Sequence, residues 1–86
     1  MPKVSEFFGI SVYIYWADHE PPHFHAIYAE SEVVVRIEDS RVLRGGLPPR
    51  ALGLLIEWTD LHRDALSSAW ERATNHLPPG TIPPLT

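Results

Sequence analysis

The chain has 86 residues with no cysteine, nine prolines, five histidines and a net charge of −4. This length fits one small domain with a single core, and the lack of cysteine excludes disulfides and cysteine-ligated zinc or iron–sulfur sites. An apolar fraction of 44% with 21% charged residues is typical of a globular protein. No apolar run reaches the ~18–20 residues of a membrane span, and residues 1–9 lack the pattern of a signal peptide. We therefore expect a cytoplasmic protein without membrane association.

Alternating apolar and polar residues predict four strands. The first, residues 10–16, places four apolar side chains on one face: Ile10, Val12, Ile14 and Trp16. Pro21 and Pro22 end this segment because proline cannot donate to a strand ladder. Similar runs predict strands at residues 23–29, 32–38 and 41–44. The short connections between the last three indicate an antiparallel meander.

After residue 46 the spacing of the apolar residues changes from that of a strand to that of a helix. Pro48 and Pro49 suit a helix start, and apolar residues recur at helical spacing from residue 51 to residue 73. The pattern predicts one helix that ends near Asn75, before the next proline pair. The fold class is therefore α+β, a four-stranded antiparallel meander packed on one face by a single long C-terminal helix. Residues 1–77 form the domain, and residues 78–86 form a proline-rich tail that we expect to dock through Ile82 and Leu85.

The predicted sheet has a second, open face with unusual chemistry. If Phe24 and Ala26 face the helix, then His23 and His25 point to the other side, about 6.7 Å apart along the strand. The same alternation adds three residues from the neighbouring strands to this face: Tyr13, Tyr15 and Arg36. The predicted open face thus gathers two imidazoles, two phenols and a guanidinium.

Three kinds of chemistry fit this group. His23 and His25 could act as the acid and base of RNA cleavage without a metal, with Arg36 binding phosphate and Tyr13 or Tyr15 stacking on the substrate. His-x-His is also a good bidentate metal donor, which His19, or one of the neighbouring carboxylates at positions 18 and 20, would complete. A structural role, with the rings bonded to loop backbone or stacked on tyrosine, is the third interpretation.

The charge distribution bears on the choice among them. Residues 36–50 carry a net charge of +2 within a chain of net charge −4. A broad basic face for nucleic-acid binding is therefore absent from the sequence. The acidic total is the main argument against RNA as the substrate.

Four stretches of the chain resemble a family of small bacterial proteins catalogued as domain of unknown function 4160. They are residues 2–10, 18–28, 47–52 and 57–63, and the Pro-Pro-His-Phe-His block at 21–25 is the most specific part. Members of that family often have Glu-Leu and Asn-Trp in the helix, where this chain has Ala65-Leu66 and Ala69-Trp70. The resemblance covers nearly the whole chain.

The resemblance implies a functional context. Genes of that family often lie beside another small protein, as in toxin–antitoxin pairs. It therefore implies a toxin-like module that acts on RNA and is neutralised by a small antitoxin-like protein partner. Together with the histidine pair, this context favours RNA cleavage without a cofactor. Two alternatives stay open, a non-enzymatic module that binds a protein through its exposed sheet face, and a small metal-binding protein with His19, His23 and His25 as ligands. A homodimer that covers the open face is a further expectation.

Overall fold

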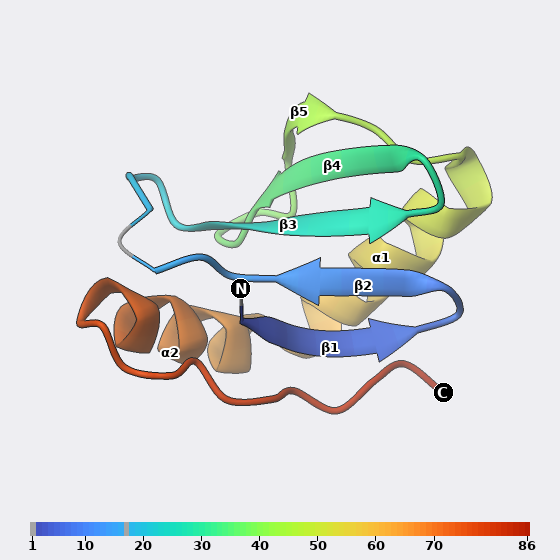
Figure 1. Ribbon diagram of the computed structural model, residues 1–86. Helices are drawn as coiled ribbons and strands as arrows, with labels where there is room; N and C mark the ends of the chain where they lie inside the picture. Colours follow the sequence, from blue (N-terminus) through green and yellow to red (C-terminus); the bar gives the residue numbers. More distant parts are fainter. Residues whose placement is uncertain (1, 17) are drawn as a thin grey trace.

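Seven elements follow one another in the computed structural model, which describes residues 2–16 and 18–86. The strands are β1 (Lys3–Phe7), β2 (Ile10–Tyr13), β3 (His23–Tyr28), β4 (Ser31–Arg36) and β5 (Val42–Gly45), and the helices are α1 (Pro49–Leu61) and α2 (Arg63–Thr74). The strands form one antiparallel sheet in the order β1-β2-β3-β4-β5 (Figure 1). The predicted α+β meander is thus confirmed, but with five strands and two helices in place of four strands and one helix.

Strand β1 is the one that the sequence pattern did not predict. Its register against β2 shifts between Lys3 and Ser5, which marks a bulge. Two successive residues, Val4 and Ser5, are consequently both buried. A bulge of this kind removes the period-2 alternation by which a strand is recognised in a sequence.

Strand β2 is shorter than predicted. It ends at Tyr13, three residues before the predicted end, and the chain then leaves the sheet. Trp16 was expected on the packed face, but it is 56% exposed. Ile14 is still fully buried, and its backbone N–H donates a hydrogen bond to the carbonyl oxygen of Pro2.

The predicted single helix is divided at His62. This residue leaves helical geometry, with φ −120° and ψ 27°. Its N–H nevertheless donates to the Trp58 carbonyl oxygen, and its own carbonyl accepts from the Leu66 N–H. The apolar spacing therefore continues across the break, which explains why the sequence predicts one helix. The His62 ring packs on Trp58, with ring centroids 5.7 Å apart.

The core lies between one face of the sheet and the two helices. Alternate residues of β3 and β4 enter it: Phe24 and Ala26, as predicted, and Val33 and Val35. Trp58 of α1 and Trp70 of α2 are the largest helix side chains in this core. None of the described helices has the length and apolar character needed to cross a membrane.

The C-terminal tail runs along β1, as Figure 1 shows in red. The Ile82 N–H donates to the Val4 carbonyl oxygen at 2.7 Å, and the Trp58 indole N–H donates to the Pro83 carbonyl oxygen at 2.9 Å. Ile82 is buried in the core and Leu85 packs against it. The tail therefore docks through the two predicted residues, on the outer edge of β1 and away from β3, the strand that carries the histidine pair.

Gly45 gives a prediction for the β4–β5 pair. Its φ is +72°, and a Cβ there would lie 2.2 Å from the Glu32 backbone oxygen. We expect Gly45→Ala to lower the free energy of unfolding by at least about 1–2 kcal/mol, because both the left-handed backbone and the clash oppose it. Chemical denaturation measures this. Gly46→Ala is the matched control, since no described atom lies within 4 Å of a Cβ at that glycine, and equal effects for the two variants would contradict the prediction.

Candidate metal centre

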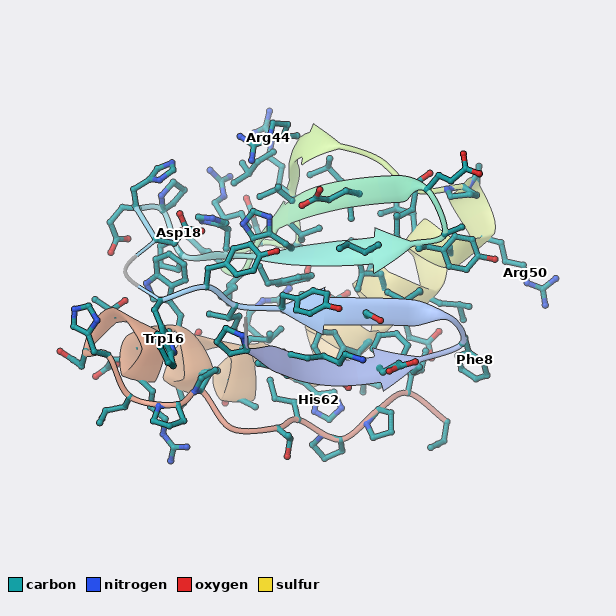
Figure 2. The ribbon with its side chains drawn as sticks, in the orientation of Figure 1. Phe8, Trp16, Asp18, Arg44, Arg50 and His62 are labelled. Atoms are coloured by element: carbon teal, nitrogen blue, oxygen red, sulfur yellow. The ribbon has the colours of Figure 1, made fainter. Side chains whose placement is uncertain are left out.

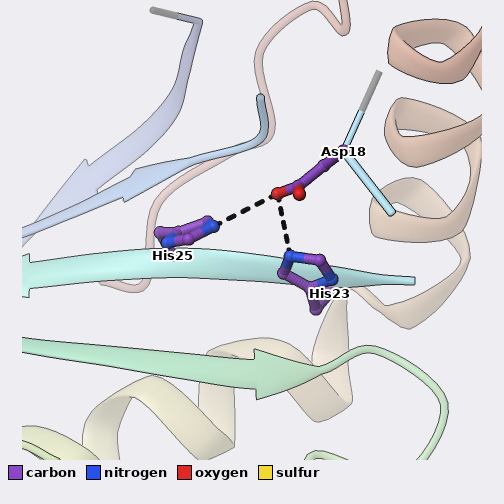
Figure 3. A group of neighbouring side chains, drawn as sticks. All are labelled: Asp18, His23 and His25. Atoms are coloured by element: carbon purple, nitrogen blue, oxygen red, sulfur yellow. Dashed lines mark hydrogen bonds and ion pairs between the residues drawn. The ribbon is translucent and has the colours of Figure 1, made fainter. Parts of the chain in front are cut away.

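Three side chains from two neighbouring segments converge at the start of β3. Asp18 comes from the β2–β3 connection, which includes a cis Glu20–Pro21 peptide bond, and His23 and His25 come from β3. The Asp18 Oδ2 atom lies 2.9 Å from His23 Nε2 and 3.3 Å from His25 Nε2 (Figure 3). The three potential ligand atoms lie within 4.8 Å of one another. One carboxylate oxygen is therefore shared by both imidazoles.

The sheet face around the two histidines is covered, contrary to the expected open face. His23 and His25 are only 6% and 8% exposed. The Tyr15 ring packs on His25 with centroids 4.4 Å apart, and the Trp70 ring of α2 packs on His23 at 5.1 Å. Val34, opposite His25 in the sheet register, is also buried. His25 lies on the side of the sheet away from the main core, where Tyr15 covers it, whereas His23 lies against Trp70 of that core.

The second nitrogen of each ring has its own partner. His23 Nδ1 lies 2.7 Å from the Pro21 carbonyl oxygen, which can only accept, so this nitrogen carries the proton. His25 Nδ1 lies 3.2 Å from the Glu32 Oε2 atom, which accepts from the ring in the same way. In the neutral tautomers that these contacts select, both Nε2 atoms present lone pairs toward Asp18.

Asp18 is held in its ionised form. Burial disfavours the charged carboxylate, but the hydrogen bond from the His19 backbone N–H, together with donation from the two rings when their Nε2 atoms carry protons, outweighs that effect, so the pKa of Asp18 falls below its ordinary value. At neutral pH the site therefore contains a carboxylate whose Oδ2 atom faces two imidazole nitrogens.

Of the other residues predicted for the site, only Tyr15 contacts one of the two buried histidine rings without also pairing with a carboxylate in the described part of the chain. Tyr13 stacks on Tyr15, with ring centroids 6.3 Å apart, and Tyr15 contacts His25 directly. The His19 side chain is 87% exposed, and it pairs with the Oδ1 atom of Asp18 instead of joining the three-atom cluster. Arg36 is the register partner of His23, but its guanidinium donates two hydrogen bonds to Asp39. The carboxylate of Asp39 accordingly has its pKa lowered to about 2, chiefly by Arg36.

Two contributions could not be assigned from the sequence. Asp18 was one of three loop residues that could complete a metal site, and no local pattern favours it over His19 or Glu20. Glu32 was expected only as the first residue of a strand. Its contact with His25 Nδ1 depends on the β3–β4 register, in which Glu32 lies opposite Ile27. A pairing of this kind is a tertiary property, so sequence spacing carries no signal for it.

Comparison with known proteins places these residues within one family. No curated protein and no solved structure matches the chain. The model of one family matches residues 9–71, a span that contains all three clustered residues and all five histidines except His76. This match confirms the resemblance inferred from the sequence. The chain belongs to the family described as domain of unknown function (DUF4160).

Proposed function

We propose that this protein binds one divalent transition-metal ion through Asp18 Oδ2, His23 Nε2 and His25 Nε2. The proposal replaces His19, the third ligand considered from the sequence, with Asp18. Two imidazoles and one carboxylate form a ligand set that suits zinc and non-haem iron, and three protein ligands leave coordination positions for a further ligand.

The distances among the donors support the proposal. Metal–ligand bonds of 2.0–2.1 Å place neighbouring ligand atoms of a tetrahedral zinc site about 3.3 Å apart. The Asp18 oxygen lies 2.9 Å and 3.3 Å from the two nitrogens. All three donor atoms lie within 4.8 Å of one another, so the donors are close enough to bind a single ion.

The placement of one carboxylate oxygen between two imidazole nitrogens favours a bound cation. When both rings are neutral with their protons on Nδ1, both Nε2 lone pairs face the Asp18 carboxylate, and this contact is repulsive unless a cation lies between them. Two protonated rings would satisfy the contacts, but they would place two positive charges on largely buried rings whose centroids are 5.3 Å apart. One divalent ion supplies the same charge at a single point and uses both lone pairs.

The surroundings of the ligands agree with this assignment. Metal-binding histidines usually donate their other N–H to a carbonyl or a carboxylate, which fixes the ring and its tautomer. His23 has the Pro21 carbonyl in this role and His25 has Glu32. A bound ion would supply Lewis acidity and a charge at which an anion can bind.

RNA cleavage by a toxin-like protein, with an antitoxin-like partner, stays a prediction from the sequence and the resemblance. In that prediction, His23 and His25 are the acid and the base, and Arg36 binds phosphate. In the structure the two rings share one carboxylate and Arg36 is paired with Asp39. These contacts favour a metal ligand set over a free acid–base pair.

Calorimetric titration of the purified chain with zinc tests the proposal. We expect one zinc ion per chain, and affinity that falls as the pH is lowered, because the imidazoles must be neutral to bind. Zinc at 100 times its Kd should stabilise the fold by about 2.7 kcal/mol. His19→Ala is the matched control and should bind zinc as the unmodified chain does. Binding weaker than millimolar, or loss of binding in His19→Ala, would refute the ligand set.

A further inference from the structure

We propose that a small oxyanion, the phosphoryl or carboxylate group of a small molecule, binds between the metal ion and the guanidinium of Arg44. This inference rests on the proposed metal site and adds the class of ligand that the site accepts.

One pocket is lined both by the proposed metal ligands and by Arg44. It has a volume of about 230 Å³ and is lined by the three metal ligands together with Arg44 of β5. Val34 and Leu43 contribute apolar surface to the same pocket. The volume is below the ~300–1,000 Å³ of pockets that enclose drug-sized ligands. It therefore suits a small anionic group rather than a whole nucleotide.

The sheet register places Arg44 on the side of the sheet that carries His25. Tyr13, His25, Val34 and Arg44 are successive partners across β2, β3, β4 and β5. Paired residues of neighbouring strands point to the same face, and at about 4.8 Å per strand the backbones of His25 and Arg44 are roughly 10 Å apart. The intervening residue is Val34, which is buried. A group that lies over Val34 would thus have the ion on one side and Arg44 on the other.

Arg44 has no competing partner in the part of the chain that the structure describes. Its side chain forms no ion pair or hydrogen bond with residues 2–16 or 18–86. By contrast, Arg36 is paired with Asp39, and Arg63 with Asp60. The phosphate-binding role that the sequence suggested for Arg36 is therefore better suited to Arg44.

The charges favour an anion at this position. A divalent ion offsets the charges of Asp18 and of Glu32, which contacts His25, and Arg44 adds one positive charge at the same pocket. An oxyanion can coordinate the ion through one oxygen and accept two parallel N–H donors from the guanidinium through its others. The pairing is a charge-assisted, bidentate contact, which is the strongest kind of hydrogen bond that arginine makes.

Cobalt(II) in place of zinc makes the inference measurable, since its visible absorption changes with its ligands. The cobalt-loaded chain is titrated with inorganic phosphate and with acetate, against chloride at matched ionic strength. We expect a saturable spectral change with phosphate or acetate, and the tighter of the two identifies a phosphoryl or a carboxylate ligand. Arg44→Ala should weaken this binding by about tenfold or more.

Arg50→Ala is the matched control, because Arg50 is an exposed arginine in the first turn of α1 and lines a different pocket (Figure 2). Its anion affinity should equal that of the unmodified chain. The absence of a saturable change with either anion would overturn the inference, as would equal affinities in Arg44→Ala and Arg50→Ala. A missing cobalt spectrum before any anion is added would instead refute the metal site itself.

Discussion

Alanine at His23 or His25 is expected to weaken zinc binding by at least about 100-fold. Loss of a contact that only orients a ligand typically costs 10–100-fold in metal affinity, and removal of a ligand should cost no less. The chain would retain a single imidazole and Asp18, a pair that defines no closed coordination geometry. Competition with a chelating dye of known zinc affinity measures the change.

Control variants separate the loss of a ligand from the loss of the fold. Asp18→Asn keeps the size of the side chain but removes the charge between the two rings, so it should also bind zinc far more weakly. His19→Ala removes an exposed imidazole beside the same carboxylate and should change the affinity less than about threefold. Amide NMR spectra show whether each variant is folded. A folded His25→Ala protein with unchanged zinc affinity would exclude His25 as a ligand.

Trp58→Ala is expected to have the largest effect on stability. Trp58 is fully buried, contacts Phe7 and Phe24 through its ring, and donates its indole N–H to the Pro83 carbonyl oxygen. Truncation of a buried tryptophan costs about 3–5 kcal/mol, out of the roughly 5–15 kcal/mol that stabilise a typical domain. Because a domain of this size shifts its Tm by roughly 4–8 °C per kcal/mol, the melting temperature should fall by more than about 10 °C.

Trp16→Ala is the matched control for that experiment. Trp16 is 56% exposed, so its loss should change the free energy of unfolding by no more than about 0.5 kcal/mol. Thermal unfolding followed by circular dichroism compares the two variants. Similar destabilisation by both would mean that Trp16 is packed, as its place in the predicted strand at 10–16 suggested.

The sequence carries most of the information about the sheet face and little about where elements begin and end. Alternation assigned Phe24 and Ala26 to the core and the two histidines to the other side, because a strand leaves only two choices. The alternation that would have indicated β1 is absent from the sequence, because the bulge near Ser5 buries two consecutive residues. The break between the two helices at His62 could not be predicted from the sequence, because neither glycine nor proline marks it and the helical spacing of apolar residues continues beyond it.

The candidate site was only partly predictable. His23 and His25 share a face through spacing alone, so the sequence suffices to pair them. The choice of Asp18 over His19 depends on how the β2–β3 connection places the two side chains, since the Oδ2 atom of Asp18 is the one that contacts both rings. The burial of the two histidines depends on Tyr15 and Trp70, and Trp70 is at least 45 residues from either histidine in the sequence. Contacts of that range are set by the fold as a whole.

A crystal structure of the zinc-loaded protein, with the metal located by anomalous scattering, tests the central claim most directly. The account predicts one strong anomalous peak about 2.0–2.2 Å from Asp18 Oδ2, His23 Nε2 and His25 Nε2, with Pro21 and Glu32 still bonded to the two Nδ1 atoms. Zinc bound at another place, or no peak at saturating zinc with both rings bonded directly to Asp18, would contradict it.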